Sequence, residues 1–589
     1  MTFFRSERGG LLPFTLIITG TVILMGALAV NTVRVEHSRS ISQSVLDICV
    51  LNAAAQRQTL EPRTVFDDCL AKHGFEGAIT DFQATTGQTK SVTATAEIEV
   101  ESFFLQDPVT FDIGVGSTAQ ETLSNLEIVL ALDVSASLAT TGPDGTVPID
   151  NLKAAANLFV DRILAEDTAG KIKITLLPYN SNVNLGADLA ARFNVINAPV
   201  NMMQNTTRIG PDVTQMRCLD LPSDSFAATG ISPTTPILAM PFLDMVGSTT
   251  RTNAYTAPTN ATTAAARLQE NLCSFHLNAP SPATNNVVFP PEYGTAALGT
   301  PQQRIAALQA RITDLRATAN ATSINLGMRW ALAFLDPQMQ AVYAALRQNN
   351  RMPPSTVDHP RAFDDPTTIK VIVLMSDGTN VDEPRMNPLY QSGTSPFWIG
   401  NDGNISWHNP LRPGTDQYWV PHAQAPGTSP PNTAPGIWQA VPWQNATNTG
   451  APARNMTYEE VWRRMKVSYV AWQFHARSVN QAAGTTIAQR NANNAARNTA
   501  YLAAMAEYLP PAMGVSATTK NDQLTQACTL ARDSNVFVYS LLFVTTTTSS
   551  PTLESCARGP GFFYSATQAD LQQAFSDIAQ HISRLQLTD

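Results

Sequence analysis

The pattern that most constrains the fold is an alternation of short apolar runs with amphipathic segments, beginning at Leu126. The run 126–134, LEIVLALDV, is apolar almost throughout, which is typical of a strand buried on both faces. Similar runs and the helical patterns between them lie at 171–179, 369–377 and 536–544, and at 149–164, 301–317, 323–335, 521–534 and 569–585. This alternation predicts a parallel sheet covered by helices on both faces, with ligand sites outside the carboxyl ends of its strands.

Two long segments interrupt this alternation, at about 180–300 and about 380–520. The first is rich in Asn, Thr and Pro, and the second opens with a tract rich in Pro, Gly and Trp. Disordered segments are poor in aromatic residues, so we expect ordered insertions that pack over the core. The tryptophans of the second insertion either rim a ligand site or pack the insertion's own core: Trp398, Trp407, Trp419, Trp438 and Trp443.

The N-terminus carries an uncharged apolar run at 11–30, LLPFTLIITGTVILMGALAV. As a helix, a run of this length spans the roughly 30 Å hydrocarbon core of a membrane. A cleaved signal peptide is the alternative, but the run is longer than the usual h-region and no small-residue cleavage site closes it. We therefore predict an uncleaved single-pass anchor with residues 1–10 as a cytoplasmic tail. Arginines stand on both sides of the run, so the positive-inside bias that sets the orientation is weak.

Residues 31–122 link the anchor to the alternating region. The first part has apolar residues at helical spacings, so the membrane helix is expected to continue outward. The stretch 91–100, SVTATAEIEV, alternates apolar and polar residues, which predicts a half-exposed strand. We interpret this region as a stalk helix followed by a small α+β unit.

The charge balance argues against nucleic acid as a partner. The chain carries 38 Lys and Arg against 47 Asp and Glu, a formal net charge of -9. A nucleic-acid-binding domain would require a basic patch, and the basic residues are scattered.

The six cysteines indicate an oxidising compartment. None forms a C-x-x-C pair, and their spacings match no zinc ribbon or finger. An even set behind a membrane anchor predicts disulfides on the extracytoplasmic side. Short loops close with the least loss of entropy, which favours pairing of neighbours along the chain: Cys49–Cys69, Cys218–Cys273 and Cys528–Cys556.

Oxygen-bearing side chains follow two of the predicted buried strands. Asp133, Ser135 and Ser137 form a D-x-S-x-S motif at the end of the first strand, and Asp377 ends another. Thr322 stands just before a predicted helix, as a capping or ligating hydroxyl. Carboxylates and hydroxyls, completed by water, are ligands that Mg²⁺ prefers. The sequence therefore predicts a divalent-cation site.

These stretches, in this order, resemble the von Willebrand factor A (VWFA) domain with its metal-ion-dependent adhesion site (MIDAS). The resemblance covers roughly 126–180, 320–380 and 520–587, within a domain expected over 123–589. It implies a bound Mg²⁺, or another divalent cation such as Mn²⁺ or Ca²⁺, with ligands from three loops: Asp133, Ser135, Ser137, Thr322 and Asp377.

The chain departs from the VWFA pattern at a few positions. Ala136 and Leu138 stand where Gly and Met are frequent, and a long gap separates the first loop from Thr322, for which Thr318 is the fallback. The alternative is a degenerate, metal-free domain in which the oxygen-bearing residues only cap helices.

Both ends of the chain resemble the TadE/TadG-like pilus-assembly proteins of the tight-adherence (Flp) pilus system. The resemblance lies in residues 4–55 and 556–589. Prepilin-type processing after Gly10 would require Glu where Thr15 stands, so we expect no such cleavage. The fold class expected is α/β: a transmembrane helix, a small α+β pilin-like region, then a doubly wound, mostly parallel VWFA (Rossmann-like) domain with two insertions.

This second resemblance implies a single-pass protein of the bacterial inner membrane with a cytoplasmic N-terminus. The bulk of the chain would be periplasmic, with the cell surface as the alternative. Its expected function is pilus assembly and adhesion, with other pilus-assembly or pilin proteins as partners and an acidic partner residue completing the metal coordination. The alternative function is a structural pilus-base component with a degenerate, metal-free VWFA domain.

An enzyme is the remaining class, and the sequence argues against it. It has no S-x-x-K or H-E-x-x-H motif and no Walker loop. The stretch 114–119, GVGSTA, imitates a dinucleotide fingerprint but precedes the first core strand instead of following it. We identify no general base near the predicted metal ligands, so we expect a binding protein without catalytic residues.

Overall fold

The computed structural model divides into two compact units, Met1–Ser124 and Asn125–Asp589. The residues it describes are 11–588 without 56–57, 59, 76, 87–88, 103–109, 123, 140, 142–144, 166, 168–169, 197–217, 241–286, 288–299, 318–320, 350–351, 353–355, 401–404, 421–442, 446–452, 465–466, 480–493 and 545–548. The predicted cytoplasmic tail, residues 1–10, lies outside them.

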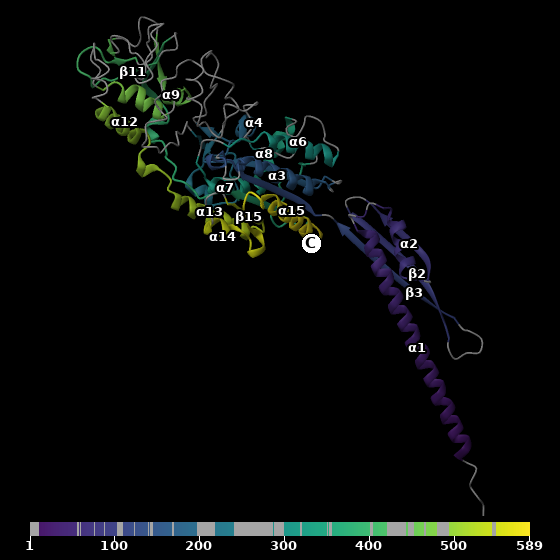
Figure 1. Cartoon of the computed structure of the whole chain (residues 1–589). Coiled ribbons are helices and arrows are strands. Elements are labelled where there is room, and N and C mark those ends of the chain that lie inside the picture. The colour runs from purple at the N-terminus through teal and green to yellow at the C-terminus, as the bar shows by residue number, and fades with distance from the viewer. Residues whose placement is uncertain are drawn as a thin grey trace, which may run out of the picture. The chain divides into compact units, whose positions relative to one another are not determined.

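The first unit is built on one long helix, α1 (Leu11–Ala54), of 44 residues (Figure 1). Its N-terminal part is apolar and fully exposed, and it is the one helix among the described residues that is long and apolar enough to cross a membrane. The rest of the unit is α2 (Pro62–Lys72) and an antiparallel sheet in the order β1-β2-β3, with strands Ala78–Thr85, Thr89–Glu101 and Thr110–Thr122.

The core of this unit lies between the C-terminal part of α1 and one face of the sheet. Leu46 and Val50 of α1 are fully buried against Phe66 of α2 and alternate residues of β2 such as Val92. The predicted disulfide Cys49–Cys69 is present and joins α1 to α2.

The second unit contains a fully parallel sheet in the order β16-β15-β9-β4-β5. The strands are β4 (Asn125–Asp133), β5 (Ile172–Tyr179), β9 (Thr368–Ser376), β15 (Phe537–Phe543) and β16 (Phe563–Ala566). The first four coincide with the predicted apolar runs, whereas the short edge strand β16 was not predicted. The prediction of an α/β fold with a parallel sheet is therefore confirmed.

Side chains of the central strand β4 alternate between two hydrophobic layers. Leu126, Ile128 and Leu130 belong to the layer that contains α3 (Pro148–Leu164), α6 (Pro301–Thr313) and α15 (Leu571–Thr588). Val129 and Ala131 belong to the layer that contains α7 (Ile324–Leu335), α8 (Gln340–Gln348), α13 (Ala517–Asp533) and α14 (Pro551–Cys556). Both faces of the sheet are covered, which explains why the strand is apolar at nearly every position.

The segment predicted as the first insertion contains a small sheet in the order β6-β8-β7, with strands Val195–Ile196, Ile237–Ala239 and Leu219–Asp220. Arg329 of α7, which is fully buried, connects this segment to the helix by hydrogen bonds. The Arg329 guanidinium donates hydrogen bonds to three backbone carbonyl oxygens at 2.5 to 2.8 Å: Ser225, Thr229 and Gly230.

The segment predicted as the second insertion contains an antiparallel sheet in the order β13-β12-β11-β10-β14. Its strands are Trp443–Gln444, Tyr418–Trp419, Ile405–His408, Thr394–Gly400 and Ala453–Thr457, and its helices include α9 (Tyr458–Arg464), α10 (Val467–Val470) and α12 (Asn494–Tyr508).

Trp419 and Trp443 pack the core of this segment, whereas Trp398 is half-buried. Trp419 is 0% exposed and Trp443 5% exposed, and the Trp419 indole N–H donates to the Gln473 carbonyl oxygen at 2.8 Å. Because Trp419 and Trp443 are buried, the alternative in which these two side chains rim a ligand site is wrong. Trp407 is half-buried against Trp443. Trp438 lies outside the described residues.

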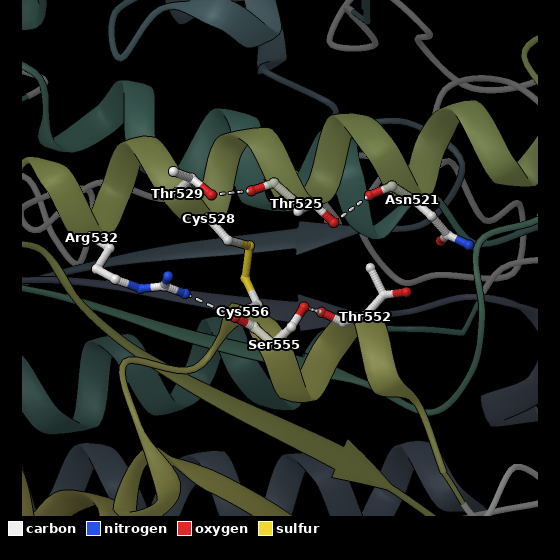
Figure 2. The surroundings of a disulfide bond; sticks show 8 residues. All are labelled: Asn521, Thr525, Cys528, Thr529, Arg532, Thr552, Ser555 and Cys556. Atoms are coloured by element: carbon white, nitrogen blue, oxygen red, sulfur yellow. Dashed lines mark hydrogen bonds between the residues drawn. A yellow bond between two sulfur atoms is a disulfide. The ribbon is translucent and has the colours of Figure 1, made fainter.

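A second predicted disulfide, Cys528–Cys556, joins α13 to α14 (Figure 2). Beside it, the Arg532 guanidinium donates to the Ser555 carbonyl oxygen at 2.9 Å, so the two helices are linked both covalently and by a hydrogen bond. Cys218 is also disulfide-bonded, and its predicted partner Cys273 lies outside the described residues.

Candidate cation-binding site

The first loop of the candidate site begins where β4 ends. Asp133 is fully buried, and its Oδ1 accepts a hydrogen bond from the Ser135 backbone N–H at 2.9 Å. The hydroxyls of Ser135 and Ser137 lie 3.0 Å apart, with Ser135 buried and Ser137 exposed. The D-x-S-x-S motif therefore forms a compact turn whose oxygens extend from the buried strand end to the surface.

The third loop lies beside the first because β9 pairs with β4 in parallel, with Met375 opposite Leu132. Asp377 follows β9 and is only 2% exposed. The Ser376 hydroxyl donates to Asp133 Oδ2 at 2.8 Å, so both oxygens of Asp133 accept hydrogen bonds. Sequence reasoning missed Ser376, although its place next to Asp377 at the end of an apolar strand could have indicated it.

The second loop contains Thr322, which is 5% exposed and stands two residues before α7. The Thr322 carbonyl oxygen accepts a hydrogen bond from the Val381 N–H at 3.1 Å. The Ile324 N–H in turn donates to Asn380 Oδ1 at 2.7 Å. The second and third loops are thus tied together, and the structure brings all three loops to the carboxyl edge of the sheet. The fallback residue Thr318 lies outside the described residues.

The end of β5 supports the same edge through Tyr179. Its side chain is fully buried, and its hydroxyl donates to the Met375 carbonyl oxygen at 2.8 Å. The ring lies against Gly327 of α7, where an added Cβ would be 2.7 Å from a ring atom. Only glycine lets α7, and with it the second loop, approach the strand ends this closely.

Gly327→Ala is therefore expected to destabilise the second unit by about 1–3 kcal/mol, because the buried Tyr179 ring cannot move aside without losing its hydrogen bond. Urea unfolding of residues 125–589 would measure this change. Gly561→Ala is the matched control, since an added Cβ there meets nothing within 4 Å. Equal unfolding midpoints for the two variants would contradict the packing argument.

Burial and the nearby Asp377 carboxylate together raise the pKa of Asp133 to about 7, against the opposing hydrogen bonds from Ser135 and Ser376. Two buried carboxylates therefore repel each other at the end of the central strands. A divalent cation held between them would replace this repulsion by attraction. The donor set, two carboxylates and three hydroxyls, consists only of oxygen and suits a hard cation.

The raised pKa predicts how the metal-free protein responds to pH. Between pH 3.8 and about 7, Asp133 is protonated in the folded state, whereas the unfolded chain, in which its pKa is near 3.8, has already lost this proton. This contribution to stability is fully present below pH 3.8 and is lost as the pH rises through about 7. Between pH 5 and pH 8 the free energy of unfolding should fall by roughly 2–3 kcal/mol from this group.

Urea unfolding of chelator-treated residues 125–589, compared with Asp133→Asn, isolates the contribution. The asparagine cannot titrate, so the difference between the two proteins should change with pH by that amount. Asp364→Asn, at an exposed position, should retain the wild-type trend. Parallel pH trends for wild type and Asp133→Asn would refute the prediction.

Among the described residues, no three His, Cys, Asp or Glu side chains gather into a cluster that could hold a metal ion. The candidate site differs in kind from such a cluster, because hydroxyls supply most of its donors. Sequence reasoning also missed Glu383 and Lys520, two fully buried charged side chains behind the second loop.

A scan against protein-family models finds no match, and a search of curated proteins finds none either. One solved structure with some likeness is the vWF domain of the type V pili tip protein Mfa5 from Porphyromonas gingivalis, with 12% identity, a TM-score of 0.30, and coverage of 80% of this chain and 98% of that chain. The pilus adhesin RrgA from Streptococcus pneumoniae has 10% identity and a TM-score of 0.30, covering 86% of this chain and 48% of that chain.

The PilB minor pilin from Streptococcus sanguinis is similar at 8% identity and a TM-score of 0.26, with 86% of this chain and 78% of that chain covered. At these identities and TM-scores the likeness does not assign a fold family or a function to this chain. The positions of Asp133, Ser135, Ser137, Thr322 and Asp377 at one edge of the sheet are independent of these comparisons.

Proposed function

We propose that this chain is a membrane-anchored protein of pilus assembly and adhesion that binds a partner through one divalent cation. In this proposal the second unit is a doubly wound VWFA domain with two long insertions. The observation that carries it is the convergence of three loops, from β4, from the start of α7 and from β9, at one edge of the sheet. Such an edge is where ligands bind in open parallel sheets.

The residues that would hold the cation are those predicted from the sequence: Asp133, Ser135, Ser137, Thr322 and Asp377. Mg²⁺ fits this donor set best, because it is bound by few carboxylates together with neutral oxygens and water in octahedral geometry. The charges of two carboxylates balance the charge of a divalent ion, so the occupied site would carry little net negative charge. The ion would remain attractive to an acidic side chain of a partner, which would complete the coordination.

Binding is favoured over hydrolysis by the roles of these residues. A hydrolase needs a base within hydrogen-bond reach of the attacking water. Both oxygens of Asp133 already accept hydrogen bonds, and Asp377 is assigned to the ion. The five residues are thus used in holding the cation, and we propose no catalytic residue among them.

The proposed location follows from the first unit. The apolar part of α1 would form a single-pass anchor in the bacterial inner membrane, with a cytoplasmic N-terminus and the second unit in the periplasm or at the cell surface. The disulfides at Cys49–Cys69 and Cys528–Cys556 suit an oxidising compartment. The pilus context rests on the resemblance of both chain ends to TadE/TadG-like proteins.

Metal analysis of the purified protein tests the proposal. Residues 125–589, dialysed against Mg²⁺ and then passed through a desalting column, should retain about one equivalent of the ion. Calorimetric titration of the chelator-treated protein should show the same stoichiometry. Absence of binding at millimolar Mg²⁺, Mn²⁺ and Ca²⁺ would leave the structural, metal-free alternative.

A further inference from the structure

A row of alternating charges, buried at its inner end, lies directly behind the second loop of the candidate site. Lys520 of α13 and Glu383, which follows the third loop, both have fully buried side chains, and Lys520 Nζ lies 2.8 Å from Glu383 Oε2. Arg385 continues the row, 3.4 Å from Glu383 Oε1, and pairs with Asp220 of β7. The row therefore runs from the first insertion to the interior behind Thr322.

The inner end of the row meets the second loop at Ser323. Lys520 Nζ donates a hydrogen bond to Ser323 Oγ at 2.6 Å, and Ser323 Oγ also lies 3.4 Å from Glu383 Oε2. Ser323 is fully buried and directly follows Thr322, whose hydroxyl is a proposed cation ligand. Its hydroxyl makes no capping bond to α7, so the side chain is committed to the charged pair.

The first turns of α13 hold the neighbouring loop residues as well. Asn521 accepts a hydrogen bond from the Asn380 side chain at 2.9 Å, and Asn380 in turn accepts the Ile324 N–H at the start of α7. The backbones of Glu383 and Val515 exchange two hydrogen bonds, at 2.9 and 2.8 Å. The segment from Val515 to Asn521 thus contacts both the second and the third loop.

Stability alone gives little reason for a charged pair in this place. Burying two charges costs several kcal/mol in desolvation, and replacing a buried ion pair by apolar residues is often neutral or stabilising. What the pair supplies is geometry, because its hydrogen bonds fix one position for the hydroxyl that they meet. Substitution of a group that orients a metal ligand in this way typically lowers the metal affinity by about 10–100-fold.

We propose that Lys520 is a positioning residue of the cation site, which with Glu383 holds Ser323 and thereby places Thr322 against the cation. This inference rests on the proposed function for its consequence, cation affinity, but not for its geometry. Lys520 itself is not a ligand, since its ammonium group would repel the ion.

The test uses the full chain in detergent and compares variants that alter the row at different points. Lys520→Met alone would leave the buried Glu383 carboxylate without its lysine partner. The main variant is therefore Lys520→Met with Glu383→Gln, which removes both charges at nearly constant volume. Ser323→Ala removes only the hydroxyl, and Ser323→Thr restores one. Asp220→Asn, at the far end of the row, is the isosteric control.

We expect the Mg²⁺ dissociation constant, from calorimetric titration, to rise 10–100-fold in the double variant. Ser323→Ala should raise it about tenfold, Ser323→Thr should recover most of the loss, and Asp220→Asn should stay within about twofold of wild type. Near-UV circular dichroism at the same temperature would establish that each variant is folded. A purely structural role would lower stability but leave the affinity of the folded protein unchanged, and that result would overturn the proposal.

A wild-type chain that binds no divalent cation would refute the proposed function, and the positioning role would then be read from amide exchange. The Val381 N–H, bonded to the Thr322 carbonyl oxygen, reports whether the second loop is held against the third. Its exchange should be at least about tenfold faster in the double variant than in wild type. Equal exchange rates would overturn the positioning role independently of metal.

Discussion

Asp133→Ala is expected to abolish Mg²⁺ binding, lowering the affinity by at least about 100-fold. Asp133 is one of only two carboxylates in the proposed donor set, and it is fully buried at the end of the central strand. Hydrogen bonds from the Ser135 N–H and the Ser376 hydroxyl fix the orientation of its carboxylate.

Calorimetric titration of chelator-treated residues 125–589 measures the loss. Asp133→Asn refines the test, because it keeps the shape and removes the charge. It should also lose Mg²⁺ binding, yet should be more stable than wild type in the metal-free state above pH 7, since the repulsion with Asp377 is gone. Asp364→Ala, at an exposed position, should bind Mg²⁺ like wild type. Full affinity in Asp133→Ala would remove the assignment of the first loop.

Cells whose chromosomal copy carries Asp133→Ala together with Ser135→Ala are expected to lose pili and surface attachment, with both counts at least about tenfold lower than in wild type. The double substitution removes a charged and a neutral ligand from the first loop while leaving the anchor untouched. If the cation completes its coordination with an acidic partner residue, the loss of the ion removes the central contact of that interface.

Pili counted by electron microscopy and cells counted after washing measure this result. Immunoblots of the membrane fraction must show the variant at the wild-type level, because an unfolded protein would be degraded and would mimic the loss. Asp364→Ala again serves as the matched variant. Normal pili and attachment in the double variant would leave only the structural role for this protein.

The core strands could be predicted because their signal is local. β4 and β9 are near-continuous apolar runs, and each ends in an aspartate or serine that has no place in a buried strand interior. The same reading placed Asp133 and Asp377 at one edge, since parallel strands end together. Four of the five candidate ligands were thus found at or just after strand ends, where sequence patterns are most informative, whereas Thr322 was placed only by the start of a helix.

The parts that could not be predicted depend on long-range contacts. Lys520 and Ser323 are 197 positions apart, and a lysine or glutamate in a sequence is by default a solvent-exposed residue. β16 has only four residues and becomes a strand by pairing with β15. The sheet of the second insertion contains strands of two residues, too short for any periodicity to show.

The tryptophan-rich tract illustrates a different limit. Its composition predicts an ordered insertion, but composition cannot distinguish an aromatic core from an aromatic binding surface. That distinction depends on which neighbours cover the rings, as Gln473 and Trp443 do for Trp419.

The course of β4 has a mechanical consequence. The strand begins at Asn125, the first residue of the second unit, and ends at Asp133 in the candidate site. In the proposed function, a tensile load applied by a bound partner and resisted by a membrane anchor would pass along one strand of about 30 Å. β4 is hydrogen-bonded to β5 on one side and to β9 on the other. A force along the strand would therefore load all of these hydrogen bonds together in shear, and they would have to break together instead of one after another.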